Sequence, residues 1–420
     1  MHLLAAPGMF RRIRSFSVRR WCPIMTYAVN PAVNRIEAPP IMEAQGWVRP
    51  GLRNRKLLNL CQAVPSWKCA EALDDEVARL AHEPGIGLYT DIFGTPALRA
   101  AIAAHFSADY RGTVAPENVC VTAGCNQAFA AAVMAIATAG DNVIVPVPYF
   151  FNHTMWLGMM GLETRFIPAV TPGRTHPDPA DAAGLVDSRT KAIVLCSPNN
   201  PTGAIYPPEV IQGFFDLARK HGIALLIDET YKDFRAGPEP AHQLFATPGW
   251  EEAFIHLYSF SKVYAMTGYR VGAITASPRI LAEIEKIMDC LAICTSHISQ
   301  RAALYALAAL DDWKRGKLAM MHNRLEALRQ AFGRPGLRYE LVSSGALFAY
   351  VKHPFTDENA KQVAMRLAGE HDLLCLPGSM FGPGQEQYLR IAFANAEATD
   401  METLADRLME SQAQRVAVGI

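Results

Sequence analysis

Short, continuously apolar runs that alternate with helical patterns restrict the fold of this chain more than any other feature. Between residues 118 and 275 there are seven such runs, at 118–121, 142–147, 164–168, 192–196, 223–227, 254–258 and 271–275. Strands that are apolar along their whole length are typical of a sheet that helices cover on both faces. The sequence therefore predicts an α/β fold with a large domain, in which a mostly parallel seven-stranded sheet is sandwiched by helices.

The pattern changes beyond Pro278, where a long helical stretch begins. It reaches residue 332, with breaks expected near 295–296 and 311–312. Strands are predicted at 337–350, 373–376 and 388–393, and helices at 358–370 and 397–410. These elements predict a smaller α+β domain in the C-terminal part of the chain.

We divide the chain into four parts. A large domain covers 66–300 and a small C-terminal domain covers 301–420. The segment at 25–65 is too short to fold alone and is expected to pack on the small domain. Residues 1–24 contain five arginines and no acidic residue. Such a segment is either an organelle presequence or an upstream extension that is disordered or not translated, and we favour the second.

Charge and composition argue against several functional classes. The 420 residues include 40 acidic and 40 basic side chains, so the net charge predicts neither a nucleic acid nor an anionic membrane as a partner. No apolar run approaches the roughly 18 residues of a membrane span. The nine cysteines form no C-x-x-C pair and the twelve histidines no H-E-x-x-H motif, so no metal site is predicted. Cysteines in this pattern favour a reduced, cytoplasmic protein.

Residues 258–272, Y-S-F-S-K-V-Y-A-M-T-G-Y-R-V-G, place two cations at the end of a buried strand. Lys262 and Arg270 are costly at such a place unless each has a partner. An amine forms a Schiff base with a carbonyl compound, and a planar guanidinium binds a phosphate. Pyridoxal phosphate carries both groups and would suit both cations. The alternative is a solvated loop after the strand.

Polar residues follow five of the seven predicted strands. They read T-A-G-C-N-Q (122–127), P-Y-F-F-N-H (148–153), S-P-N-N-P-T-G (197–203), D-E-T-Y (228–231) and the stretch that contains Lys262. In a parallel sheet the carboxyl ends of the strands meet at one edge, where ligands bind. A single polar strand end is an ordinary turn, but five at the same edge indicate a site.

In this order and at these intervals, the segments resemble the class I/II aminotransferases, which are pyridoxal-phosphate enzymes of fold type I. The resemblance covers roughly residues 35–408, and two further motifs carry it, P-G-S-M-F-G-P-G (377–384) and L-R-I-A-F-A (389–394). It implies an aminotransferase that moves an amino group from an L-amino acid to a 2-oxo acid such as 2-oxoglutarate. Pyridoxal 5'-phosphate is the implied cofactor.

The resemblance assigns catalytic roles to Lys262, Asp228 and Tyr231. Lys262 would bond the cofactor and carry a proton between substrate and cofactor, and burial together with Arg270 would lower its pKa. Asp228 would pair with the pyridine nitrogen and keep the ring an electron sink. Tyr231 and Asn200 would bond the phenolic oxygen of the ring. Taken singly, Asp228 is also a common strand cap and Asn200 a common turn residue.

The same resemblance assigns the phosphate site. The phosphate would rest on the amides of Gly124 and Cys125 at a helix N-terminus. The Ser259 hydroxyl and a bidentate Arg270 would complete this cradle. Cys125 departs from the family, which usually has Ser or Thr there, and a thiol is a weak donor.

Four more residues complete the implied site. Phe150 would stack on the cofactor ring, although a core aromatic is an almost equal alternative. Tyr89 would reach the phosphate of a partner subunit, which implies a homodimer with shared active sites. Arg390, a charge inside an apolar strand, would bind the α-carboxylate of the substrate. Ala63 stands where the family often has glycine, and its methyl group would narrow the site near that carboxylate.

The identity of the substrate is less constrained. Dicarboxylate-selective relatives carry a second arginine in the segment that corresponds to 289–298, and D-C-L-A-I-C-T-S-H-I contains none. A neutral or aromatic amino donor is therefore favoured, while aspartate stays open because relatives bind dicarboxylates with different pockets.

Two other functions use the same fold. One is a C–S β-lyase or another reaction at Cα, which the motifs alone do not separate from transamination. The other is a regulator that senses the cofactor, which would need a DNA-binding domain before the fold. Residues 1–34 are too short for that domain and lack helix-turn-helix periodicity.

Overall fold

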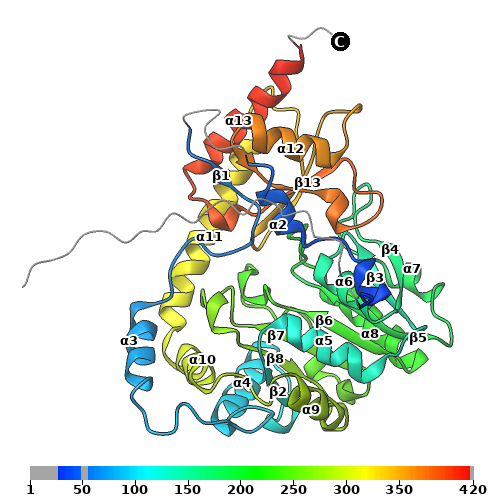
Figure 1. Cartoon of the computed structure of the whole chain (residues 1–420), viewed down its shortest axis with the longest axis vertical. Coiled ribbons are helices and arrows are strands. Elements are labelled where there is room, and N and C mark those ends of the chain that lie inside the picture. The colour runs from blue at the N-terminus through cyan, green and yellow to red at the C-terminus, as the bar shows by residue number, and fades with distance from the viewer. Residues whose placement is uncertain (1–26, 49–54, 417–420) are drawn as a thin grey trace, which may run out of the picture.

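The computed structural model of the protein describes residues 27–48 and 55–416, so the predicted extension at 1–24 lies outside the described residues. The molecule has two lobes (Figure 1). The lower lobe in that view holds a seven-stranded sheet, and the upper lobe holds two small sheets. The long helix α11 (Asp311–Phe332) runs from the lower lobe into the upper one. Within the described ranges, no helix combines the length and the hydrophobicity that a membrane crossing requires.

The seven predicted strands are all present and form one sheet. They are β2 (Val119–Thr122), β3 (Asn142–Val147), β4 (Glu163–Pro168), β5 (Thr190–Cys196), β6 (Ala224–Asp228), β7 (Phe254–Ser259) and β8 (Gly272–Thr275). Their order across the sheet is β2-β8-β7-β6-β5-β3-β4. The pairs from β7 to β4 are parallel, and β8 is antiparallel to both of its neighbours. The predicted α/β fold with a mostly parallel sheet is therefore confirmed.

Helices cover both faces of this sheet because successive strand residues point to opposite sides. In β6, Leu225 and Ile227 belong to one buried cluster and Leu226 belongs to the other. The first cluster includes residues of α4 (Pro96–Asp109), α8 (Pro208–His221) and α10 (His297–Ala309). The second includes residues of α5 (Cys125–Ile136), α6 (Phe151–Met159) and α9 (Pro278–Ala292). The sheet thus separates two apolar cores.

Shorter elements complete the lower lobe. Helix α3 (Glu71–Leu80) lies against α10, and α7 (Pro179–Ala183) lies against α8. The 3-10 helices are η1 (Pro116–Asn118), η2 (Lys232–Phe234), η3 (Leu244–Ala246), η4 (Trp250–Glu252) and η5 (Thr267–Tyr269), with η6 (Gly378–Phe381) and η7 (Phe393–Asn395) in the upper lobe. The helix breaks predicted near 295–296 and 311–312 fall between α9 and α10 and between α10 and α11.

The upper lobe differs from the prediction in two strands. The single strand predicted at 337–350 is a hairpin of β9 (Glu340–Gly345) and β10 (Phe348–Lys352), because the chain turns at Ala346, whose φ is 47°. The strand predicted at 373–376 is divided between β11 (Leu373–Leu374) and β12 (Leu376–Pro377), which pair in different sheets. An apolar run does not reveal the second break, since both β11 and β12 are buried.

The remaining elements join the upper lobe to the start of the chain. Strand β12 pairs with β13 (Tyr388–Ile391). Helix α12 (Ala360–Glu370) lies against β11, β12 and β13, and α13 (Asp400–Val416) lies against α11 and α12. Strand β1 (Leu58–Asn59) pairs with β11. Helix α1 (Pro31–Asn34) lies against α6, and α2 (Pro40–Gln45) lies near β12.

Candidate active site

A cavity of about 340 Å³ lies beyond the carboxyl ends of the parallel strands, where the polar segments were expected to meet. Eight of the predicted site residues line it: Cys125, Phe150, Asn200, Asp228, Tyr231, Ser259, Lys262 and Arg270. They follow β2, β3, β5, β6 and β7, so segments separated by more than a hundred residues meet at one edge of the sheet. Gln62 and Val64, from the segment before the first long helix, also line the cavity.

Lys262 is the amine of this cavity. Its Nζ donates to the backbone oxygen of Ala63 over 2.7 Å. Burial, followed by the charges of Arg390 and Arg270, lowers the pKa of Lys262 to about 8. Because the neutral amine is the nucleophile, an amine with this pKa is far more reactive near neutral pH than an exposed lysine.

Asp228, at the end of β6, is the carboxylate of the cavity. Its Oδ2 lies 3.2 Å from His153 Nε2, and its Oδ1 accepts the backbone N–H of Thr230 over 3.0 Å. Burial on its own raises the pKa of Asp228, but the hydrogen bonds from His153 and Thr230 outweigh it and lower the pKa. Asp228 is therefore an ionised group with a fixed orientation, as a partner for a protonated ring nitrogen must be.

His153 is a residue to which the sequence had assigned no role. It lies in α6, and its ring stacks on Phe129 at 4.2 Å and meets Phe150 edge-on at 5.2 Å. These contacts hold the ring against Asp228. The available signal was its place in the polar segment after β3, but a histidine in a turn suggests no specific partner by itself.

Arg390, on β13, does not line the cavity itself, but it is bonded to Asn200, which does, and its charge acts on Lys262. One of its Nη atoms donates to Asn200 Oδ1 over 3.1 Å, and the other donates to the backbone oxygen of Cys61. Its guanidinium lies over the rings of Phe348 and Phe381. Burial lowers the pKa of Arg390 to about 10.

The charge of Arg390 has no counterion. Arg390 is 2% exposed, its Nε has no hydrogen-bond partner, and no carboxylate within the described ranges pairs with it. A buried guanidinium in this state is a receptor for an anion. Asn200 positions it, since Asn200 accepts from Arg390 and also lines the cavity.

Gly124 and Arg270 meet at the other end of the cavity. Gly124 precedes α5 with a φ of 83°, and a Cβ at that position would lie 2.4 Å from Arg270 Nη2. Arg270 itself has a left-handed backbone, with a φ of 55°, and donates to the backbone oxygens of Thr267 and Ala123. Glycine is thus required for the close approach that brings the start of α5 beside Arg270. Backbone N–H groups and a guanidinium there suit a phosphate.

Ser259, Cys125 and Tyr231 also line the cavity. The Ser259 hydroxyl accepts the backbone N–H of Ser261 over 3.2 Å. Burial, and then the charge of Asp228, raises the pKa of the Cys125 thiol, which is therefore neutral. Burial also raises the pKa of Tyr231, whose ring packs edge-on against Phe348 at 5.1 Å. Tyr231 is thus a protonated phenol that is able to donate a hydrogen bond into the cavity.

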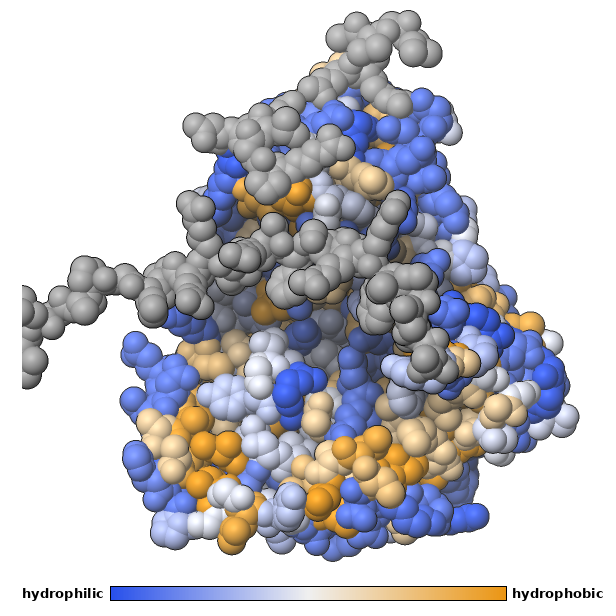
Figure 2. All heavy atoms as spheres, in the orientation of Figure 1, coloured by the Kyte–Doolittle hydropathy of each residue, from blue (hydrophilic) through white to orange (hydrophobic). Residues whose placement is uncertain are grey.

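Tyr89 is the one predicted site residue that lies on the outer surface, away from the others. It is 76% exposed, and Leu88 beside it is 70% exposed. The loop that carries them contacts the segment after α9, because the backbone N–H of Thr90 donates to Cys294 Sγ. Leu291, near the end of α9, is also exposed, with an exposed fraction of 50%. Figure 2 shows apolar surface over the region of α5, α9 and α10, whereas the upper lobe is mainly hydrophilic.

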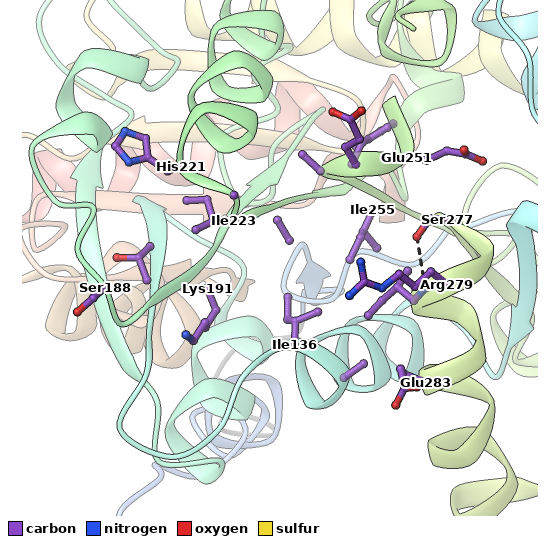
Figure 3. A pocket seen from close by; sticks show the side chains of 18 of the residues that line it. Ile136, Ser188, Lys191, His221, Ile223, Glu251, Ile255, Ser277, Arg279 and Glu283 are labelled. Carbon is purple, nitrogen blue, oxygen red and sulfur yellow. Dashed lines mark hydrogen bonds between the residues drawn. The ribbon is translucent and has the colours of Figure 1, made fainter. Parts of the chain in front are cut away.

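A larger cavity, of about 800 Å³, lies at the opposite, amino edge of the sheet (Figure 3). Residues at the starts of β5, β6, β7 and α9 line it. Several of its charged groups have partners: Lys191 lies 3.6 Å from Asp141, and Glu283 lies 2.6 Å from Lys286. The Ser277 hydroxyl accepts the backbone N–H of Ile280 at the start of α9. This cavity has volume, but it lacks a buried amine facing a buried carboxylate.

The family model and the similar proteins all indicate the same family. The chain matches the family model described as aminotransferase class I and II over residues 55–408. It is similar to Aromatic aminotransferase ISS1 of Arabidopsis thaliana, with 29% identity over 359 residues that cover 84% of this chain and 88% of that protein. It is also similar to the aspartate aminotransferase of Thermotoga maritima, with 28% identity over 357 residues, 85% of this chain and 90% of that protein.

Among solved structures, a crystal structure of the aspartate aminotransferase from Thermotoga maritima has the same fold. The TM-score is 0.82 at 26% sequence identity, and the match covers 92% of this chain and 100% of that chain. The similarity therefore extends over both lobes.

Proposed function

Because this chain belongs to the class I and II aminotransferases, we propose that it moves the amino group of a neutral or aromatic L-amino acid to a 2-oxo acid such as 2-oxoglutarate. Amino-acid aminotransferase activity follows from the family and from the named relatives. The observation that carries the proposed site is the meeting of one amine, one carboxylate and two guanidinium groups: Lys262, Asp228, Arg270 and Arg390.

Three features of the site fit pyridoxal phosphate, the cofactor that this family uses. The Lys262 amine, with a pKa of about 8, is suited to bond an aldehyde. The glycine at 124 lets the start of α5 lie against Arg270, which suits a phosphate. Asp228 is ionised and buried between them, which suits a protonated ring nitrogen. The cavity of about 340 Å³ extends along all three.

The chemistry is divided between the cofactor and these side chains. Bound pyridoxal phosphate supplies an aldehyde that takes up the amino group and a ring that withdraws electrons from the reacting carbon. In our proposal Asp228 holds the proton on the ring nitrogen, and Tyr231 and Asn200 bond the ring oxygen. Lys262 would hold the cofactor and, as a free amine, would take the proton from the substrate Cα.

Binding of the two anions is assigned to opposite ends of the cavity. Arg390 would take the α-carboxylate of the substrate, because its charge lacks a counterion among the residues described. Gly124, Cys125, Ser259 and Arg270 would take the phosphate. Phe150 would pack on the cofactor ring, since it lines the cavity next to His153.

The preference for a neutral or aromatic donor rests on the lining of the cavity. Lys262 and Arg270 are the only cations among the residues that line it, and both are already assigned. Gln62, Val64 and Phe150 supply neutral surface, and Ala63 stands close to the amine. A second carboxylate on the substrate would find no further guanidinium in this lining, so aspartate is expected to be the poorer donor.

We also propose a homodimer and a cytoplasmic location. The exposed apolar residues Leu88, Tyr89 and Leu291 support the dimer, because a second subunit would cover them. The cytoplasmic location is supported by the free state of all cysteines for which the structure gives a position.

A screen of donor and acceptor pairs tests the proposal. Purified protein with pyridoxal phosphate is given tyrosine, phenylalanine, methionine, leucine or aspartate, with 2-oxoglutarate or pyruvate, and the new oxo acid is measured. We expect turnover with at least one neutral or aromatic donor and a lower kcat/KM with aspartate. Higher kcat/KM with aspartate would overturn the proposed donor class, and no turnover with any pair would overturn the proposed reaction.

Omitting the acceptor separates transamination from β-elimination. A transaminase given only an amino acid stops after one equivalent of oxo acid per site, with loss of the visible absorption of the bound cofactor. A C–S β-lyase given cystathionine or cysteine continues to release oxo acid and ammonia. Continued release would favour the lyase.

A further inference from the structure

The residues of the D-E-T-Y turn face two directions. Asp228, Thr230 and Tyr231 line the cavity, whereas Glu229 points away from it into the protein. Glu229 is fully buried, with an exposed fraction of 0%. A carboxylate is almost never buried completely unless other groups satisfy it. The proposed chemistry uses Asp228 and Tyr231 and leaves Glu229 without a role.

Three donors converge on Oε2 of Glu229, while its Oε1 is buried without a hydrogen-bond partner. The Tyr110 hydroxyl, from the end of α4, donates to Oε2. His256 Nε2, from β7, lies 2.9 Å from the same oxygen, and His242 Nε2 lies 3.3 Å from it. The rings of Tyr110 and His242 stack at 4.6 Å. Through these contacts Glu229, directly after β6, is linked to the end of α4, to β7 and to the segment before η3.

The hydrogen bonds define the protonation state of this cluster. His242 Nδ1 accepts the backbone N–H of Leu244 over 3.2 Å, so its proton is on Nε2 and the ring is neutral. Burial lowers the pKa of His256, and its Nδ1 has no partner, so this ring is neutral as well. Burial alone raises the pKa of Glu229, but the hydrogen bonds that His242 and His256 donate to it favour the ionised carboxylate and lower the pKa. The cluster carries one negative charge.

The backbone of Glu229 connects this charge to the turn. Its N–H donates to the Leu257 oxygen over 2.9 Å, and its own oxygen accepts the N–H of Lys232 over 3.0 Å. Tyr231 lies inside the turn that the second bond closes. Asp228 precedes Glu229 directly, and its backbone oxygen accepts the N–H of Ser197 over 3.1 Å. A shift of Glu229 would therefore move Asp228 and Tyr231 together.

The charge of Glu229 also acts on the cavity. Burial, the charge of Asp228 and, more weakly, the charge of Glu229 raise the pKa of the Cys196 thiol, which lines the cavity. Near the turn, Lys232 forms ion pairs with both Asp109 and Asp233, and His105 lies 3.3 Å from Asp109. Glu229 differs from them because its donors are all neutral, so its charge is not cancelled by a cation within the cluster.

We propose that Glu229 is a positioning residue of the active site, held by Tyr110, His242 and His256, which fixes the Asp228–Tyr231 turn and contributes a buried negative charge behind it. The inference rests on the proposed function, since it assigns Glu229 to the side of the turn opposite the cofactor. A negative charge there would favour the protonated forms of groups in the cavity.

The test uses the holoenzyme with Tyr110→Phe and Glu229→Gln. Tyr339→Phe is the matched control, because its hydroxyl is also buried, lies 2.7 Å from Ser411 Oγ and belongs to the upper lobe. The readouts are the rate of cofactor release after dilution, kcat and KM, the melting temperature, and the pH midpoint of the visible absorption of the bound cofactor. The release rate, kcat and KM report on the active site, whereas the melting temperature reports on the stability of the whole protein.

We expect Tyr110→Phe to release the cofactor about tenfold faster and to lower kcat with little change in KM, whereas Tyr339→Phe lowers only the melting temperature. Glu229→Gln should also move the pH midpoint toward acid by roughly 0.5 units, because it removes a negative charge that stabilises the protonated form. Equal behaviour of the two phenylalanine variants would overturn the proposal, as would an unchanged midpoint in a folded Glu229→Gln variant.

If Glu229→Gln does not fold, the comparison of Tyr110→Phe with Tyr339→Phe decides the question. Failure of the proposed function has a different signature. In that case the wild-type protein would show no visible absorption with pyridoxal phosphate and no transamination, whatever stands at position 229.

Discussion

The two edges of the seven-stranded sheet differ in how their charged groups are paired. At the amino edge, the larger cavity has Lys191 beside Asp141 and Glu283 beside Lys286. At the carboxyl edge, the smaller cavity has Lys262 bonded to a backbone oxygen and Arg390 buried near it without a carboxylate. Unsatisfied buried charge, and not volume, therefore distinguishes the candidate active site.

This comparison explains why the two edges have different capacities for chemistry. Ion pairs near the surface hold each charge in its ordinary state and contribute little. A buried amine near two guanidinium groups is instead destabilised as an ammonium, so it becomes a nucleophile. Matched substitutions at the two edges test this difference directly.

The largest effect is expected for Lys262→Ala. Without this amine the protein loses both the attachment of the cofactor and the group that moves the proton, so kcat should fall at least about 10³-fold. The variant should stay folded and lack the yellow colour of the loaded protein. Lys191→Ala, at the amino edge, should stay within about twofold of the wild type because its surface ion pair contributes little. Similar losses in both variants would remove the distinction between the edges.

Arg390→Gln should act mainly on substrate binding. Two charge-assisted hydrogen bonds to a carboxylate are lost, which predicts a KM for the amino donor about 10²-fold higher. Cofactor release should change much less. Arg279→Gln is the control, because Arg279 lines the amino-edge cavity and is exposed. A KM unchanged by Arg390→Gln would mean that the carboxylate binds elsewhere.

The pKa of Lys262 predicts a pH dependence of cofactor attachment. The neutral amine forms above the pKa, so the rate of colour formation from cofactor-free protein should rise with pH and level off above a midpoint of about 8. Arg390→Gln removes a positive charge that lowers this pKa and should move the midpoint upward. A rate that keeps rising toward pH 10 would show an ordinary lysine.

The smallest effect is expected for Cys125→Ser. A hydroxyl is a better donor than the neutral thiol at this place, so the cofactor should dissociate about threefold more slowly. The rate is measured by diluting the loaded protein and following the loss of the bound cofactor's absorption. Cys290→Ser, at an exposed cysteine, should leave the rate unchanged. Faster release from Cys125→Ser would show that the thiol suits the site better than a hydroxyl.

The strands of the lower lobe were predictable because most of them are buried along their whole length and mainly apolar, whereas β4, with the sequence E-T-R-F-I-P, is the exception. In β3 the predicted and observed bounds agree, at Asn142–Val147. The upper lobe was harder, since Ala346 itself takes the left-handed backbone of the turn, and the single Gly345 before it did not by itself predict a break in the strand. The split between β11 and β12 depends on which strands are available as partners, β1 and β13, and no local pattern encodes that choice.

The candidate site was predictable as a set of residues and not as a network. Residues such as Lys262 and Arg270 stand in motifs with a recognisable spacing. The contact of His153 with Asp228 and the three donors around Glu229 join residues far apart in the chain. Histidine and tyrosine side chains have many suitable partners, so the sequence suggested no specific pair among them.

The order of apolar and polar segments along the chain was sufficient to determine that this protein builds a two-sided sheet with its polar residues at one edge, because burial on both faces leaves no other place for them. Only the tertiary structure decided which of those polar groups lack a partner. Whether a charge is paired depends on how segments far apart in the chain come together in space. That arrangement leaves Lys262 and Arg390 without carboxylate partners, whereas it brings three neutral donors to Oε2 of Glu229.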